Sequence, residues 1–134
     1  MVFKFRRKRE IPWEVVETRS ISPVSMHIDG EGADNLTIVD VGDKETRGTY
    51  VFDVKNISTS AMQNAVVFAR KQLMEEVHKR NHNILIVESW NLTILRRGHH
   101  YRVEVQYAGL GARAAGKLPH LTSPPFMDTL QELI

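Results

Sequence analysis

Several short stretches in the first half of the chain alternate between apolar and polar residues. Over residues 49–55, the apolar side chains of Tyr50, Phe52 and Val54 occupy every second position. This period of two is typical of a strand with one buried face. Ser22-Pro23 interrupts the earlier alternation, and we expect a break there because proline lacks a backbone donor. Similar shorter stretches predict strands over residues 13–18, 24–28 and 36–41.

The period changes to three and four residues after Ser58. Ser58, Thr59 and Ser60 are favourable N-cap residues, and Asn81-His82-Asn83 supplies a stop. Intervals of three and four place apolar side chains on one stripe of an α-helix. The sequence therefore predicts one amphipathic helix over about residues 60–80. Its apolar stripe consists of Met62, Ala65, Val66, Ala69, Leu73 and Val77.

Two strands joined by a short turn follow the helix. Residues 84–87 are apolar at every position, as in a strand covered on both faces, and alternation then continues to residue 95. Residues 100–107 alternate again after the turn Arg96-Arg97-Gly98-His99. This pattern predicts an antiparallel hairpin. We expect Trp90 to lie in the core, covering the apolar stripe of the helix.

Together these elements predict an α+β fold in a single domain. One amphipathic helix packs on a curved antiparallel sheet with a β-α-β-β core, and the earlier short strands extend that sheet. Residues 1–10 form a basic flexible tail, and residues 11–134 form the domain. Within it, we expect residues 108–134 to be an extended C-terminal arm, because glycine and proline recur there. The end of the arm is apolar, so it forms one helical turn and offers a docking segment for a protein partner.

Composition excludes several classes of protein. The chain has 134 residues, of which 42% are hydrophobic, enough for one core. It has no cysteine, which excludes disulfide scaffolds, cysteine-ligated metals and thiol chemistry. The longest apolar run, residues 84–87, is far shorter than the ~20 residues that span a bilayer. No apolar segment follows the basic N-terminus, so we expect a cytoplasmic protein, with the nucleus as the alternative.

Charge is distributed unevenly, although the net charge is only +2. Residues 1–9 carry five basic and no acidic residues, whereas residues 10–60 carry ten acidic and four basic ones. Such a bipolar chain is suited to self-association, although mixed charge also serves solubility. The N-terminal cations are suited to nucleic acid or another polyanion as well. They are Lys4, Arg6, Arg7, Lys8 and Arg9.

A second basic cluster lies at the predicted hairpin tip. Arginine offers a planar fork of donors to phosphate, and tyrosine offers a face on which a base can stack. The alternative is a solvated turn whose charges discourage edge pairing. The candidate ligand-binding residues are Trp90, Arg96, Arg97, His99, Tyr101 and Arg102.

Candidates for catalysis are few. Glu88 has apolar neighbours on its strand, where a carboxylate can act as an acid or base; pairing with Arg96 or Arg102 is the alternative we favour. His100 is the second candidate. The sequence has no nucleophile motif and no glycine-rich phosphate loop. We therefore predict no cofactor and no metal site, and we favour a protein that is not an enzyme.

The order strand, helix, long strand, strand over residues 49–107 resembles the dodecin fold, with Trp90 on the long strand and residues 101–106 returning beside it. Dodecins wrap one helix with a three-stranded antiparallel sheet, assemble into hollow particles and stack flavins on a strand tryptophan. The resemblance is one of shape and covers less than half of the chain. It implies the fold expected above and transfers no function.

These observations favour a non-enzymatic interaction or assembly module that forms homo-oligomers. One alternative is a small-molecule binding protein or small enzyme, with a pocket for a planar or anionic ligand between helix and sheet. The other is a nucleic-acid-binding protein that uses the basic tail and the hairpin tip.

Overall fold

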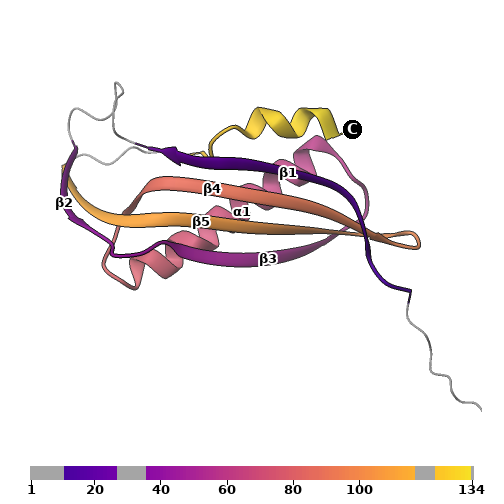
Figure 1. The fold of residues 1–134 in the computed structure, drawn as a ribbon, viewed down its shortest axis with the longest axis horizontal. Coiled ribbons are helices and arrows are strands. Elements are labelled where there is room, and N and C mark those ends of the chain that lie inside the picture. Colours follow the sequence, from indigo (N-terminus) through magenta and orange to yellow (C-terminus); the bar gives the residue numbers. More distant parts are fainter. Residues whose placement is uncertain (1–10, 27–35, 117–122, 134) are drawn as a thin grey trace, which may run out of the picture.

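The computed structural model describes residues 11–26, 36–116 and 123–133 (Figure 1). The predicted basic tail, residues 1–10, lies outside the described residues. The fold is mixed: one α-helix lies across one face of a five-stranded antiparallel sheet that does not close into a barrel. In order along the chain, the elements are β1 (Glu14–Ser25), β2 (Leu36–Val41), β3 (Thr46–Val54), α1 (Thr59–His78), β4 (Ile84–Arg97), β5 (His100–Gly116) and the 3-10 helix η2 (Met127–Leu133).

The two longest strands, β4 and β5, form the centre of the sheet. β4 pairs over its whole length with residues 100–112 of β5 as the predicted antiparallel hairpin, with Arg97 opposite His100 at the turn. β1 pairs with the outer side of β4. The outer side of β5 is shared, because β3 pairs with its first half and β2 with its last residues. β1 is therefore one edge of the sheet, and β3 with β2 forms the other.

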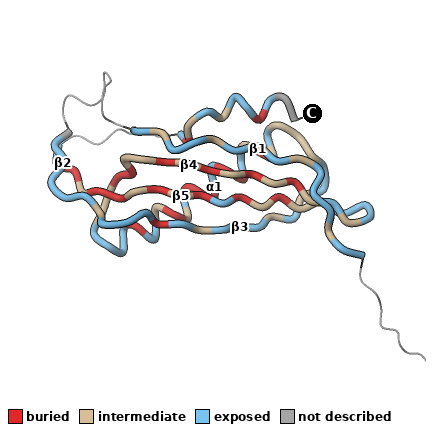
Figure 2. The backbone as a smooth tube through the Cα atoms, in the orientation of Figure 1, coloured by how far each residue is buried: buried red, intermediate tan, exposed pale blue. Residues whose placement is uncertain are grey.

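The predicted helix is confirmed. The Ser58 hydroxyl accepts the N–H of Ala61 at 3.1 Å and caps the first turn. After α1 the chain turns at Asn81, which adopts a positive φ of 68°. The apolar stripe of α1 faces the sheet, and Met62 and Leu73 are completely buried there. Figure 2 shows the buried positions along β4, β5 and the inner side of α1, whereas β1 and β3 are mostly exposed or half-buried.

The expected break at Ser22-Pro23 is wrong. β1 continues through both residues to Ser25, with a shift in register between Ile21 and Val24. An edge strand needs hydrogen bonds on one side only, so a bulge accommodates the proline without ending the strand.

The expectation that an arm begins at residue 108 is also wrong, because β5 runs to Gly116. Its glycines lie where other side chains press on the strand. A Cβ atom on Gly109 would lie 2.8 Å from Cδ2 of Leu85, and one on Gly111 would lie 2.7 Å from Nδ1 of His82. Glycine thus marks close packing inside the sheet here rather than its end.

The C-terminal segment packs on the core. η2 supplies the predicted final helical turn and contacts α1 and β1. Leu130 of η2 is completely buried in the core cluster that also contains Trp90.

Candidate functional site

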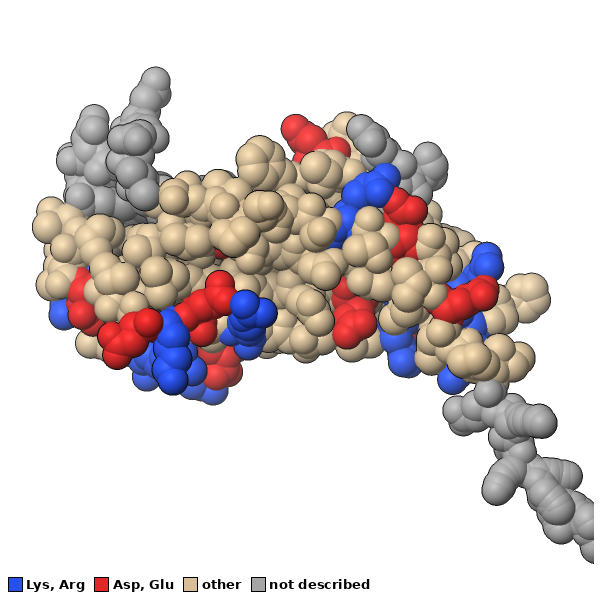
Figure 3. Space-filling model, in the orientation of Figure 1, with Lys and Arg blue, Asp and Glu red and all other residues tan. Residues whose placement is uncertain are grey.

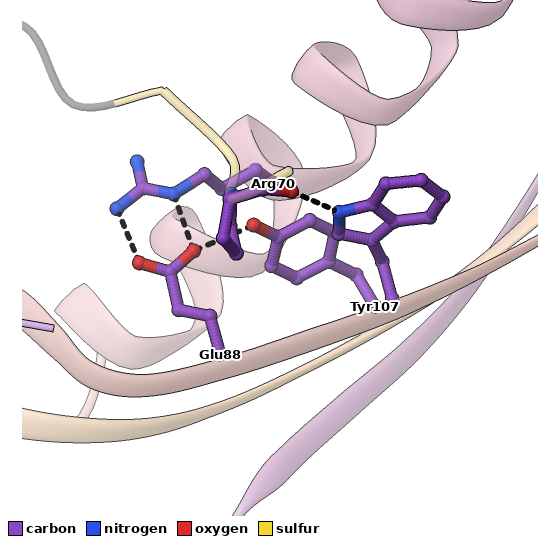
Figure 4. A network of polar contacts seen from close by, with 5 residues as sticks. Arg70, Glu88 and Tyr107 are labelled. Carbon is purple, nitrogen blue, oxygen red and sulfur yellow. Dashed lines mark hydrogen bonds and ion pairs between the residues drawn. The ribbon is translucent and has the colours of Figure 1, made fainter. Parts of the chain in front are cut away.

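Three polar side chains meet inside the core, between α1 and the centre of the sheet (Figure 4). Glu88 of β4 is 0% exposed and accepts two hydrogen bonds from Arg70 of α1, from Nε at 2.7 Å and from Nη2 at 3.0 Å. The hydroxyl of Tyr107 on β5 donates a third hydrogen bond to Glu88, at 2.5 Å. This triad therefore joins the helix to both central strands.

Two members of the triad, Tyr107 and Arg70, have pKa values raised above their ordinary ones. Burial raises the pKa of Tyr107, and the negative charge of Glu88 raises it further. For Arg70, burial alone would lower the pKa, but the hydrogen bonds and charge of Glu88 outweigh burial and raise it. Three donors occupy the Glu88 carboxylate, which has no exposed surface. The geometry is that of a structural ion pair with a hydroxyl ligand.

The partner expected for Glu88 from the sequence is wrong. Arg96 pairs with Glu14 on β1 at 2.7 Å, and Arg102 pairs with Asp53 on β3 at 3.1 Å. Sequence reasoning overlooked Arg70 because it is charged. Its position nevertheless signals burial, since it lies four residues after Val66 and three before Leu73, on the apolar stripe of the helix.

Trp90 is in the core, as predicted. It is 2% exposed, and its indole N–H donates to the carbonyl oxygen of Pro125 at 2.9 Å. The C-terminal segment thus covers the tryptophan, and a flat ligand would stack on it only after displacing that segment. Side chains of α1 and η2 fill the space around Trp90 in which the sequence suggested a pocket.

The predicted basic cluster at the hairpin tip lines a hollow of about 590 Å³. The guanidinium carbons of Arg97 and Arg102 lie 4.6 and 4.3 Å from the centroid of the Trp13 ring, at distances typical of cation–π contacts. One indole ring therefore positions two arginines. The hollow is lined by Trp13, Asp53, Val54, Lys55, Arg97, His99, His100, Tyr101 and Arg102.

The structure divides the predicted ligand-binding residues. Arg97, His99, Tyr101 and Arg102 line this hollow, and so does His100, the second catalytic candidate. Arg96 and Trp90 do not line it. The predicted polyanion-binding residues Lys4, Arg6, Arg7, Lys8 and Arg9 lie outside the described residues.

Sequence reasoning missed Trp13 as a member of this hollow. Its place there depends on the pairing of β1 with the far end of β4, for which the sequence carries no signal. Glu14 lies opposite Arg96 in that pairing, which brings the preceding tryptophan to the hairpin tip.

The face of the sheet opposite α1 is not covered by any described helix. Figure 3 views this face and shows charged side chains along its margins, with a mostly uncharged centre. Across that centre the strand register aligns Ser20, Asn91, Gln106 and Thr49. Together with Arg47 they line a hollow of about 260 Å³, and within the described chain the Asn91 side-chain oxygen is buried without a hydrogen-bond partner.

The described ranges contain no group of three or more histidine, aspartate or glutamate residues placed to hold a metal ion. No helix in those ranges has the length and apolarity needed to cross a membrane.

The chain was compared with known proteins in three ways, and no family model, curated protein or solved structure matches it. Its function is therefore inferred from its own surfaces.

Proposed function

We propose that this protein is a non-enzymatic interaction module that assembles with copies of itself. The observation that carries the proposal is that the sheet has an uncovered face and an unpaired edge strand. No described helix covers one of its faces, and the outer side of β3 pairs with no described strand. An unpaired edge strand can satisfy its outward-facing N–H and C=O groups by pairing with a strand of another chain.

The chemistry of the bare face supports a second copy as the partner. Charged residues make up 25% of the chain, yet the centre of this face is mostly uncharged, with Arg47 as the one charged residue that lines its hollow among the described residues (Figure 3). Depletion of charge is typical of the core of a protein interface. Serine, threonine, asparagine and glutamine each donate and accept, so like surfaces on two copies do not repel one another.

The buried triad supports a protein without catalysis at Glu88. A general acid or base must reach its substrate within hydrogen-bonding distance. Glu88 instead lies at 0% exposure with its oxygens taken by Arg70 and Tyr107. The triad is suited to fixing α1 on the sheet, and we propose that β3, α1, β4 and β5 form the curved β-α-β-β core that the sequence predicts.

The oligomeric state tests this proposal. Sedimentation equilibrium and multi-angle light scattering over micromolar to near-millimolar concentrations should show a mass at least twice the 15.4 kDa of one chain. A mass of one chain throughout that range would refute self-assembly.

The hairpin-tip hollow supports a second candidate function, the binding of anionic ligands such as nucleic acid. Among the described residues that line it, Arg97, Arg102 and Lys55 are cations, His99 and His100 accompany them, and Asp53 is the one carboxylate. Guanidinium groups held on an aromatic ring are preorganised for phosphate.

Binding at the hollow is measurable through Trp13, because Trp90 is buried. Single-stranded oligonucleotide and inorganic phosphate, titrated separately, should change the Trp13 fluorescence, and the oligonucleotide affinity should fall steeply with salt. Arg97→Gln should weaken binding, whereas Arg113→Gln, a change outside the hollow, should not. Equal affinity of the two variants would exclude this site.

A further inference from the structure

The two edges of the sheet differ in how they are protected. β1 carries two shifts in register, between Val15 and Glu17 and between Ile21 and Val24, and it contains Pro23. Bulges and proline are the usual means of preventing an edge strand from pairing with another chain. β1 is therefore a protected edge.

β3 has none of these features. It pairs with β5 from Thr46 to Val54 without a shift in register, and it contains no proline. Its outer side meets no described strand. Val51 of β3 is 53% exposed. Phe68 of α1 is 48% exposed and packs edge-to-face on Phe52 of β3, with ring centroids 5.6 Å apart. A regular, unpaired strand flanked by exposed apolar side chains is suited to addition of another strand.

The charges along β3 favour a second copy of the same strand. Arg47 and Asp53 lie on the open face of β3, and Glu45 and Lys55 flank the strand, one residue before it and one residue after it. The order of charge is negative, positive, negative, positive along the chain. An antiparallel copy reads the same order in reverse, so each charge meets its opposite.

The complementary alignment is centred on Tyr50. Arg47 then lies opposite the partner's Asp53, and Glu45 lies opposite the partner's Lys55. A two-residue shift in one direction places Glu45 opposite the partner's Asp53. The same shift in the other direction places Arg47 opposite the partner's Lys55. Like charges directly opposite each other are unfavourable. The charges therefore favour one register among those that place the open faces of both copies on the same side of the joined sheet.

We propose that two copies of this chain pair through β3, antiparallel and centred on Tyr50, to form one continuous sheet. The two-fold axis is perpendicular to the sheet, so both α1 helices lie on the same face. This inference rests on the proposed self-assembly and specifies the surface that mediates it. Backbone hydrogen bonds supply affinity, and the ion pairs supply register, since exposed pairs contribute little stability.

The four charges remain available for this contact. Within one chain, Arg47 donates to Glu45 at 2.8 Å and Arg102 donates to Asp53 at 3.1 Å. All four residues are exposed. The partner's charges thus join existing surface pairs and need no buried charge.

Charge exchange tests the register. Glu45→Lys places lysine opposite the partner's Lys55, and Lys55→Glu places glutamate opposite the partner's Glu45. Each variant alone converts two attractive pairs into two repulsive ones, so its dimer dissociation constant should rise roughly tenfold. In an equimolar mixture, every such position again opposes lysine to glutamate, and heterodimers should form with wild-type affinity. Gln131→Lys, an exposed position on η2, which contacts α1 and β1 but not β3, should leave the dissociation constant unchanged.

Cross-linking tests the geometry directly, because the native chain has no cysteine. Thr49 lies opposite the partner's Val51 in the proposed register. A mixture of Thr49→Cys and Val51→Cys variants should therefore form an oxidised heterodimer rapidly. Ser20→Cys on β1, mixed with either variant, should not.

The outcomes distinguish the two proposals. If wild-type protein associates but Glu45→Lys, Lys55→Glu and their mixture match it, pairing through β3 is wrong and self-assembly stands. If the single variants dissociate and the mixture does not recover, the register is wrong. If the wild-type chain is monomeric at every concentration, both proposals fail. Thermal unfolding of each variant by circular dichroism confirms that the fold is intact.

Discussion

Replacement of Arg70 by methionine removes one partner of a buried ion pair and keeps an unbranched apolar side chain in place of the arginine stem. The change leaves the carboxylate of Glu88 at 0% exposure with only the hydroxyl of Tyr107 as a donor. A buried carboxylate without a counter-charge is costly, because it has left water and gained little in return. We therefore expect Arg70→Met to destabilise the fold severely.

The magnitude follows from the geometry. Arg70 supplies two of the three hydrogen bonds that Glu88 receives and the only positive charge of the triad. Breaking a buried pair by removal of one partner costs about 3–5 kcal/mol. A domain of this size has a total free energy of unfolding of about 5–15 kcal/mol. The variant should lose a fifth or more of its free energy of unfolding.

Urea denaturation followed by circular dichroism measures this loss. With a slope of about 2 kcal/mol per molar urea, the midpoint should fall by about 2 M. The matched comparison is the triple variant Arg70→Met, Glu88→Met, Tyr107→Phe, which removes the unpaired charge and the hydroxyl together. It should recover most of the loss, because an apolar replacement of a buried pair is often neutral.

Two results would refute this reasoning. A midpoint for Arg70→Met within the error of the wild type would show that water reaches Glu88. A triple variant less stable than Arg70→Met would show that the triad stabilises the fold beyond the cost of its buried charge.

Three further substitutions test other parts of the structure. Because burial raises the pKa of Tyr107, the unfolded chain ionises first as the pH rises above about 10, and stability should then fall by up to about 1.4 kcal/mol per pH unit. The free-energy difference between wild type and Tyr107→Phe, from urea titrations at several pH values, should be constant below pH 10 and shrink above it; a constant difference throughout contradicts the shift. Ser58→Ala removes the N-cap of α1 and should cost about 1 kcal/mol in the same assay, whereas Ser60→Ala should cost less. Leu130→Ala should cost about 2–5 kcal/mol by leaving a cavity under η2, with exposed Gln131→Ala as the neutral control; equal effects would mean that η2 is not docked.

The elements that could be predicted from the sequence are those with a strong period. The helix was predictable because an interval of three and four residues over some twenty positions has no strand counterpart. The hairpin was predictable because two alternating stretches flank a short turn with a glycine. Gly98 indeed adopts a positive φ of 63° there.

The end of β5 could not be predicted because glycine occurs both where a strand ends and where a neighbouring side chain packs closely on a strand. At Gly109 and Gly111 it permits Leu85 and His82 to press on the strand, and such contacts depend on residues distant in sequence. The effect of Pro23 on β1 also could not be predicted, because it depends on which strand lies beside it. Whether proline ends a strand depends on whether its missing donor would have had a partner, and at an edge it need not.

The candidate sites were predictable only in part. Adjacent basic residues at a turn were visible in the sequence, and four of the six predicted ligand-binding residues do line one hollow. The contribution of Trp13 depends on the pairing of β1 with β4, some eighty residues away in sequence. Arg70 was hidden because a charged residue on a helix is usually solvent-exposed, and only its partner on β4 makes burial possible.

The buried triad and the proposed β3 contact use charge for the same purpose. Hydrophobic packing alone tolerates several alignments of a helix on a sheet, because its contacts are not directional. A slip of one residue in β4 would turn Glu88 to the bare face and leave Arg70 buried without a counter-charge. In the same way, a slip of β3 against its partner would oppose like charges. In both places, alignment with the complementary charge is favoured mainly because the alternatives are penalised, which is why we expect the charged groups to determine register more strongly than they determine stability.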